Sequence, residues 1–427
     1  MLRRLDLRGQ GLDLRGRLPR PSAGGDAPLQ AVQEILAAVR ERGDDAVRDL
    51  TERFDGCRID DPHVPLEECR AALERIDPAL RTALEVAAAN IRAYHEAQVP
   101  AEAEHRADGM VVQELRRPVD RAACYAPGGR AIYPSTVLMT VIPAKVAGVP
   151  EVVLTVPPRR DGTLPDEVLA AAAVAGADEV LRIGGAQAIG ALAYGTDLIR
   201  PVDVIVGPGN VYVALAKREV AGVVGIPSAF AGPSEVVVVA DASAPAQFAA
   251  VDVVLQAEHG PDGLAWLVTW DEAVADAVTE EITRIVEASP RRADTEATLQ
   301  DGGYAVLVDG PEQAIAVANE VAPEHLELVT ENPEALLPMV KHAGAVFCGP
   351  WAPASMGDYA AGPNHVLPTF GSARFSEALR VDDFVKHVHV VTLDRGGFDR
   401  LAEHVVALAD AEGLHAHAES VRLRQRS

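Results

Sequence analysis

The sequence predicts an α/β protein. It should contain two tandem Rossmann-like domains, each incomplete and each with a mostly parallel sheet, between a helical N-terminal segment and a small C-terminal α/β tail domain. Short apolar runs rich in valine and isoleucine alternate with alanine-rich runs of helical spacing, first over residues 137–221 and again over residues 235–348. Strands that are apolar at every position are usually covered by helices on both faces, which favours parallel sheets. Aromatic residues make up 4% of the chain, which suits layers packed through small side chains.

The first 110 residues are predicted to precede these domains. Residues 1–24 should form an N-terminal arm, and residues 25–110 a helical lead-in that packs with the second α/β domain. Apolar residues recur at intervals of three and four in two stretches of the lead-in, residues 29–54 and 77–98, which predicts about three helices. The second stretch opens with Asp77 and Pro78, a pair typical of an N-cap and a first helical residue.

The remaining chain is predicted to divide into residues 111–235, 236–373 and 374–427, which form the two Rossmann-like domains and the tail. Strands are expected at residues 152–156, 179–183, 202–206, 235–240, 265–269, 305–308, 326–329 and 345–348. Helices are expected at residues 137–147, 166–175, 186–194, 211–221, 246–256, 272–288, 311–320 and 333–342. Residues 351–369 lack periodicity and should form an ordered functional loop. The tail should hold a strand at residues 388–393 and two helices separated near Gly413.

Charge and cysteine usage exclude several classes of protein. The 63 acidic residues outnumber the 39 lysines and arginines, giving a net charge of −24, which is the opposite of the basic surface that nucleic-acid binding requires. The four cysteines are scattered and form no Cys-x-x-Cys pair, which argues against disulfides and against a thiolate zinc site. No apolar stretch is typical of a signal peptide or a membrane span, so we expect a cytoplasmic protein without a membrane partner.

Three glycine-rich turns indicate a nucleotide site in the first domain. They lie at residues 126–129, 184–187 and 207–210, where each would place backbone amides at the start of a helix, a position that favours phosphate. None completes the Gly-x-Gly-x-x-Gly pattern of ordinary dinucleotide-binding proteins. Each turn alone also fits a tight strand-to-helix connection. Together they favour a nucleotide crevice at the carboxyl ends of the strands.

Gln256 and His259 are a candidate pair of metal ligands. They lie three residues apart at the end of a predicted helix, so their side chains should share one face. A catalytic zinc site needs about three protein ligands and a structural site about four, so this pair alone is insufficient. A polar helix end with a capping histidine is the alternative. Asp358 and His417 could complete the set, although each also fits an ordinary surface residue.

Glu324 and His325 are candidates for proton transfer, because a carboxylate and an imidazole suit acid/base chemistry near neutral pH. Neighbours on a straight strand would face opposite ways. A bend at Pro323 could aim both into one cavity. The alternative is one buried and one solvated side chain.

The chain resembles the histidinol dehydrogenase family from about residue 30 to its C-terminus. The motifs that carry the resemblance, in order, are Tyr125-Ala-Pro-Gly-Gly-Arg130, Gly185-Ala-Gln-Ala-Ile189, Gly207-Pro-Gly-Asn210, Ala231-Gly-Pro-Ser-Glu235, Gln256-Ala-Glu-His-Gly260, Pro323-Glu-His-Leu-Glu327, the segment 357–369 and Glu412-Gly-Leu-His-Ala-His417. The segment 357–369 around Asp358 is the most specific of them.

The resemblance implies a zinc enzyme that catalyses the last steps of histidine biosynthesis, oxidising L-histidinol to L-histidine through L-histidinaldehyde in two NAD-dependent steps. It implies one Zn²⁺ per subunit, bound by Gln256, His259, Asp358 and His417, which would position the substrate. His325 would accept the alcohol proton, and Glu324 would activate the water that attacks the aldehyde. The other implied contacts are Ser234, His365 and Glu412 for the substrate and Tyr125, Gln187 and Asn210 for NAD.

The resemblance also implies a homodimer with shared active sites, in which Glu412 and His417 of each tail serve the other subunit. Two alternatives remain open from the sequence. One is a catalytically silent protein that binds a metal or a nucleotide, against which the intact Glu324-His325 pair argues. The other is a related dehydrogenase that acts on another imidazole or amino alcohol.

Overall fold

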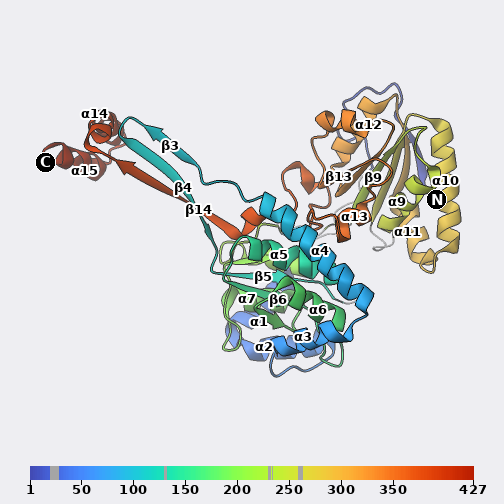
Figure 1. Ribbon diagram of the computed structural model, residues 1–427, viewed down its shortest axis with the longest axis horizontal. Helices are drawn as coiled ribbons and strands as arrows, with labels where there is room; N and C mark the ends of the chain where they lie inside the picture. The colour runs from blue at the N-terminus through green and yellow to red at the C-terminus, as the bar shows by residue number, and fades with distance from the viewer. Residues whose placement is uncertain (20–27, 129–131, 229–231, 233, 258–262) are drawn as a thin grey trace.

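The computed structural model describes residues 1–19, 28–128, 132–228, 232, 234–257 and 263–427. These residues form two lobes, each around its own sheet, and a narrow tail that extends away from both (Figure 1). The predicted α/β class with mostly parallel sheets is confirmed, because the two larger sheets pair their strands in parallel except at β2 (His63–Val64). No described helix is long and apolar enough to span a bilayer.

The first lobe has a five-stranded sheet in the order β2-β7-β6-β5-β8. Its parallel strands are β5 (Arg121–Tyr125), β6 (Glu151–Thr155), β7 (Glu179–Leu181) and β8 (Val204–Val206). One face packs against α5 (Pro134–Val146) and α6 (Asp166–Ala175), and the other against α7 (Gly185–Tyr194) and α8 (Val211–Val220). Sequence periodicity did not identify β5, whose alanine-rich segment lacks the β-branched residues of the other strands.

The lead-in packs on the first lobe, and the prediction that it packs with the second was wrong. It forms α1 (Leu29–Arg42), α2 (Asp44–Asp55), α3 (Leu66–Arg75) and α4 (Pro78–Ala97). The apolar residues of α1 and α2 join the core around α7 and α8, and those of α3 and α4 join the core around α5 and α6. These helices complete both outer layers of the first sheet. The predicted cap is confirmed, because the Asp77 side chain accepts a hydrogen bond of 2.7 Å from the backbone N of Ala79.

The second lobe has a six-stranded sheet in the order β1-β11-β10-β9-β12-β13. The strands are β1 (Arg3–Asp6), β9 (Glu235–Ala240), β10 (Leu264–Thr269), β11 (Gly303–Leu307), β12 (His325–Val329) and β13 (Ala345–Cys348). Three helices cover one face, α9 (Ala246–Ala257), α10 (Glu272–Ala288) and α11 (Arg292–Gly302). The other face packs against α12 (Pro311–Val321) and the 3₁₀ helix η1 (Pro333–Met339). The N-terminal arm therefore contributes the edge strand β1 to this lobe.

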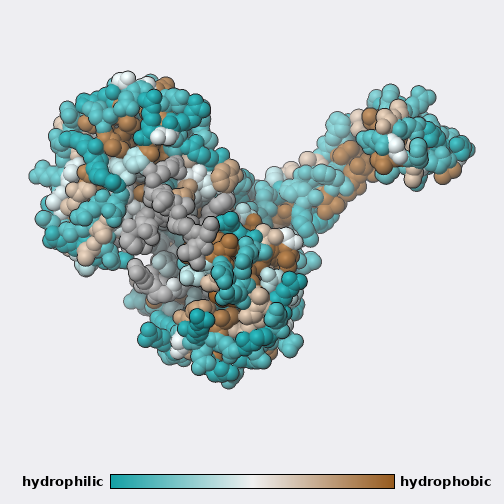
Figure 2. Space-filling view, turned by 180° about the vertical axis from the view of Figure 1, so that it is seen from behind, coloured by the Kyte–Doolittle hydropathy of each residue, from teal (hydrophilic) through white to brown (hydrophobic). Residues whose placement is uncertain are grey.

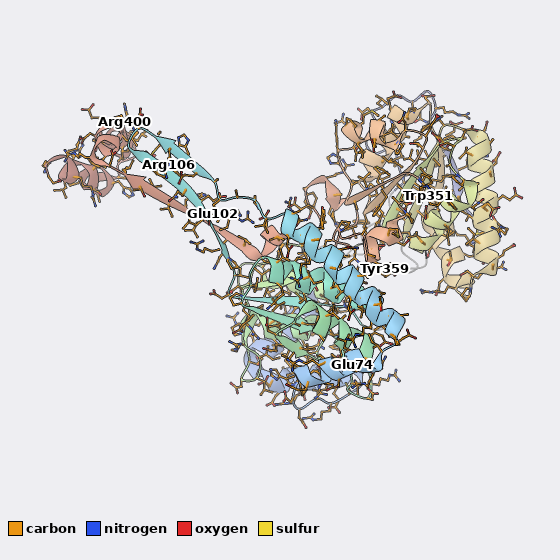
Figure 3. The ribbon with its side chains drawn as sticks, viewed as in Figure 1. Glu74, Glu102, Arg106, Trp351, Tyr359 and Arg400 are labelled. Carbon is orange, nitrogen blue, oxygen red and sulfur yellow. The ribbon has the colours of Figure 1, made fainter. Side chains whose placement is uncertain are left out.

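The tail is built from two segments that are far apart in the sequence. Its antiparallel sheet joins β3 (Glu104–Ala107) and β4 (Met110–Pro118) to β14 (Val385–Leu393), followed by α14 (Arg395–Ala411) and α15 (His415–Gln425). Residues 104–118 were expected in the lead-in and first domain, and this expectation was wrong because they pair with β14. Arg106 and Arg400 lie on the projecting part of the tail (Figure 3).

The tail exposes many apolar side chains, seen as brown atoms along it in Figure 2. The largest of them are Val388, Val391, Leu393, Leu401, Val405, Leu408, Leu414 and Leu423, which are 38–66% exposed. Exposed apolar side chains in this number are typical of a protein interface.

Candidate active site

A cavity of about 300 Å³ lies between the two lobes and gathers half of the twelve predicted site residues. From the second lobe come Ser234, Gln256, Glu324, His325, Asp358 and His365, and from the first lobe Thr136 and Lys217. The predicted loop over residues 351–369 contains one regular element that the sequence did not indicate, the short helix α13 (Ala354–Tyr359). This helix carries Asp358.

Glu324 and His325 both point into this cavity, as the predicted bend requires. The chain turns one residue before Pro323, because Ala322 adopts the left-handed conformation with φ 51° at the end of α12. Glu324 therefore precedes the strand, and His325 is its first residue. Both are buried, at 8% and 4% exposed, so the alternative of one buried and one solvated side chain is wrong.

Hydrogen bonds fix both side chains. The Oε2 atom of Glu324 accepts a bond of 3.2 Å from the backbone N of Glu235, and Ser234 bonds to the same carboxyl group. The Nε2 atom of His325 lies 3.1 Å from Oδ1 of Asp358. Its Nδ1 atom lies 3.9 Å from Oε2 of Glu324 and has no hydrogen-bond partner in the described part of the chain.

The two groups shift each other's protonation. Burial raises the pKa of Glu324, and the adjacent His325 offsets part of this rise. Burial alone would lower the pKa of His325, but the Glu324 and Asp358 carboxylates raise it by more, so the net shift is upward. A carboxyl group and an imidazole whose protonation depends on each other are suited to passing protons during a reaction.

His365 also lines the cavity and is held by two hydrogen bonds. Its Nδ1 atom lies 2.8 Å from the carbonyl oxygen of Asp358, and its Nε2 atom lies 3.1 Å from Oγ1 of Thr136 on α5. The histidine thus connects the loop after α13 to the first lobe. Thr136 had no signal in the sequence, because its role depends on the packing of one lobe against the other.

Among the described residues, one chain brings only two of the proposed metal ligands together. Gln256, at the end of α9 and 2% exposed, lines the same cavity as Asp358. His259 lies outside the described residues. Glu412 and His417 lie on the tail and are exposed, away from both lobes (Figure 1). No cluster of three or more histidine, cysteine or acidic side chains that could hold a metal occurs among the residues that the structure describes.

A second cavity, of about 1010 Å³, lies in the first lobe and contains the three predicted NAD contacts. Tyr125 ends β5, and its hydroxyl accepts a hydrogen bond of 3.1 Å from the backbone N of Gly185. Gln187 is 1% exposed, and its Nε2 donor has no partner among the described residues. Asn210 caps α8 by accepting bonds of 3.0 and 3.1 Å from Tyr212 N and Val213 N.

Two of the glycine-rich turns begin helices, as predicted: Gly184 and Gly185 at α7, and residues 207–210 at α8. Gly207 has φ 104°, and a Cβ atom there would lie 2.0 Å from the carbonyl oxygen of Tyr125. Gly129 of the third turn lies outside the described residues. Pro127 lines both cavities, so the two cavities are neighbours.

Sequence reasoning missed Lys217, which lines the smaller cavity at 3% exposure. Its Nζ atom donates a hydrogen bond to the carbonyl oxygen of Gly207. Burial lowers its pKa to about 8. The signal was present, because Lys217 falls within the buried stripe of α8 formed by Val213, Ala216 and Val220.

Comparisons with known proteins give one consistent family. The family model of histidinol dehydrogenase matches residues 18–425. The histidinol dehydrogenase of Parasynechococcus marenigrum is 50% identical over 396 residues, 92% of this chain and 90% of that protein. That of Bacillus subtilis is 47% identical over 405 residues, 95% of each. The crystal structure of histidinol dehydrogenase from Elizabethkingia anophelis has a TM-score of 0.94 at 33% identity and covers 100% of this chain and 98% of its own.

Proposed function

Because this chain belongs to the histidinol dehydrogenase family, we propose that it oxidises L-histidinol to L-histidine through L-histidinaldehyde, reducing one NAD in each of two successive steps. These are the last steps of histidine biosynthesis. The observation that carries the proposal is the buried Glu324-His325 pair, in a cavity that adjoins the larger one holding Tyr125, Gln187 and Asn210. Hydride transfer is the chemistry of NAD, so the protein's task is to hold the reacting carbon near the nicotinamide and to move protons.

His325 accepts the alcohol proton in the first step. Its Nε2 atom is paired with Asp358, which leaves Nδ1 as the nitrogen without a hydrogen-bond partner among the described residues. Glu324 then removes a proton from the water that attacks the aldehyde. Its carboxyl group is suited to this step because Ser234 and the backbone of Glu235 hold it in one orientation.

The donors present fit a zinc ion. Gln256 and Asp358 supply two oxygen atoms to one cavity, and His259 with His417 of a second copy would supply two imidazoles, a mixed oxygen and nitrogen set that zinc accepts. These residues would hold one Zn²⁺ per subunit, which would supply a Lewis acid to position the imidazole and amine of the substrate. Ser234, His365 and Glu412 would contact the substrate directly. The tail that carries Glu412 and His417 extends away from its own lobes, which supports a homodimer with shared sites. We propose a cytoplasmic location.

A titration of NADH against histidinol tests this function. The zinc-loaded protein should form two NADH for each histidinol, lose activity in a chelator and recover it when zinc is added. A protein without the acid/base pair, Glu324→Gln with His325→Ala, is the control for background reduction. One NADH per histidinol, or no turnover by zinc-loaded protein, would reject the proposed reaction.

A further inference from the structure

Two buried carboxyl groups lie behind the candidate active site, and the proposed reaction uses neither. Glu327 is 1% exposed and Asp252 is 7% exposed, and their side chains share a hydrogen bond. Such a bond requires a proton on one of the two groups. Burial first, and then the charge of Asp252, raise the pKa of Glu327 to about 9. The pair therefore carries one proton at neutral pH.

The pair lies where the elements that carry the site residues meet. Asp252 and Gln256 are four residues apart on α9, so they lie on one face of the helix. Glu327 and His325 are two residues apart on β12, so they lie on one face of the sheet. The hydrogen bond between Asp252 and Glu327 thus joins the helix of a proposed zinc ligand to the strand of the proposed base.

Glu327 also holds the third element. Its Oε1 atom accepts a hydrogen bond of 3.2 Å from the backbone N of Ala354, the first residue of α13. Asp358 follows Ala354 by four residues, one helical turn later. Because α13 has only six residues and a loop on each side, this bond fixes the end of the helix from which Asp358 extends.

We propose that the Asp252–Glu327 pair is a positioning device: by joining α9, β12 and α13, it holds Gln256, His325 and Asp358 in the arrangement that the site requires. The inference rests on the proposed function for the roles of these three residues. The positioning of α9, β12 and α13 is a property of the chain itself and requires neither metal nor substrate. The charged groups that act on Glu327 are Asp252 from α9 and Asp358 from α13, so loss of the shared proton would add repulsion between these elements.

Three variants separate positioning from general packing. Glu327→Gln keeps the shape and can still donate to Asp252 and accept from Ala354, whereas Glu327→Leu can do neither. The matched control is Val238→Ala, because Val238 lies directly opposite Glu327 on β9 and is 0% exposed. This control disturbs packing on the same face of the sheet but leaves the hydrogen bonds of Glu327 to Asp252 and Ala354 intact.

The first readout is hydrogen exchange in the metal-free protein over residues 350–360. Glu327→Leu should exchange about tenfold faster than the wild type in this segment, because the Ala354 amide loses its acceptor. Glu327→Gln and Val238→Ala should exchange at the wild-type rate. Equal rates in Glu327→Leu and Val238→Ala would overturn the proposal.

The second readout is the pH dependence of unfolding. The folded chain holds the Glu327 proton up to a pH of about 9, whereas the unfolded chain releases it near the ordinary glutamate pKa of 4.5. The stabilisation is therefore complete below the unfolded value and is lost as the pH rises toward 9. Between pH 6 and 8 the unfolding constant of the wild type should rise with pH about tenfold per unit more steeply than that of Glu327→Gln. Parallel slopes would overturn the proposal.

The third readout is zinc affinity, which tests whether the Asp252–Glu327 pair positions the proposed zinc ligands. Glu327→Leu should bind zinc about 10- to 100-fold more weakly than the wild type, while Glu327→Gln and Val238→Ala bind it normally. Unchanged zinc affinity in Glu327→Leu would contradict positioning of the ligands. A wild-type protein that binds no zinc would instead reject the metal part of the proposed function, and the exchange and pH results would still decide whether the pair positions α13.

Discussion

Glu324 is the residue that we propose as the general base of the second oxidation. Because its carboxyl group is 8% exposed and held by Glu235 N and Ser234, it has one defined orientation toward the cavity. We predict that Glu324→Gln slows conversion of the aldehyde by about 10²- to 10⁴-fold, the usual loss when a general base is removed. The first oxidation, for which His325 is the proposed base, should be slowed less. The yield of NADH per histidinol should therefore fall from two toward one.

An aldehyde trap provides the measurement for this variant. With semicarbazide present, Glu324→Gln should yield one NADH and one trapped aldehyde per histidinol. Glu320→Gln, an acidic residue on α12 outside the cavity, serves as the control and should still yield two NADH. Formation of histidine by Glu324→Gln at the wild-type rate would assign the water activation to another group.

The buried Lys217 lowers the free energy of unfolding by an amount that depends on pH. Burial lowers its pKa to about 8 from the ordinary lysine value of 10.5, so at pH 7 the buried ammonium costs about 3 kcal/mol. Because the unfolded chain holds the proton to higher pH, this cost disappears as the pH rises from 8 to 10.5. We predict that Lys217→Met raises the free energy of unfolding by about 1–2 kcal/mol at pH 7, after loss of the bond to Gly207. The gain should vanish near pH 10.

Denaturant titrations from pH 6 to 10 measure this effect. Lys145→Met is the control, because Lys145 is partly exposed and paired with Asp178 at 2.7 Å. That variant should lose a little stability, because it loses this ion pair, and should show no gain at pH 7. A Lys217→Met protein less stable than the wild type at every pH would contradict the prediction.

The sequence identifies residues that lie in recognisable motifs better than residues whose role depends on contacts between distant elements. Gln256, Glu324, Asp358 and His365 were predicted and line one cavity, because the motifs that contain them carry the family resemblance. Lys217, Asp252 and Glu327 were missed. Each is a charged residue in an element whose neighbours are apolar, and charged residues usually face solvent. The burial of Asp252 and Glu327 follows from packing partners on other elements, whereas Lys217 also lies within the buried stripe of α8.

At the scale of elements, Asn210 has two roles that mutation can separate. It caps α8 through bonds to Tyr212 N and Val213 N, and it lines the larger cavity. We predict that Asn210→Ala lowers the free energy of unfolding by about 1 kcal/mol. Asn210→Asp should keep the cap and the stability. It should nevertheless raise KM for NAD by about tenfold, because a carboxylate there repels the cofactor phosphates.

Thermal unfolding and steady-state kinetics of the two variants test this separation. Asp77→Ala removes the cap of α4 instead and is the control: it should lose similar stability without a change in KM for NAD. If Asn210→Asp binds NAD as the wild type does, Asn210 only caps the helix and does not face the phosphates.

The boundaries of elements were predictable where periodicity is strong. The strands β9 and β13 and the helices α6 and α10 have the predicted bounds. The lead-in helices α1, α2 and α4 fall in the predicted stretches, whereas α3 lies outside them, and the apolar faces do not reveal which sheet they cover. The strands β1 and β5 lacked a recognisable pattern, because four residues and an alanine-rich segment provide too little alternation.

At the scale of the whole molecule, the tail was the hardest part to predict. Its sheet pairs Val388 with Leu115 across most of the chain, and no local pattern indicates a partner so distant. Once formed, the sheet holds α14 and α15 away from both lobes (Figure 1). The position of Glu412 and His417 then becomes informative, because two residues implied for the site lie where their own chain cannot use them.

Mixing two inactive variants tests whether sites are shared. Glu324→Gln damages the lobe side of a site, and His417→Ala damages the tail side. In a mixed dimer that shares its sites, one site receives both lesions and the other receives neither. Equal amounts of the two variants, unfolded together and refolded, should therefore regain histidine formation at about a quarter of the wild-type rate. Each variant refolded alone controls for residual activity. If each site is instead completed within one chain, no mixture will exceed the sum of the separate variants.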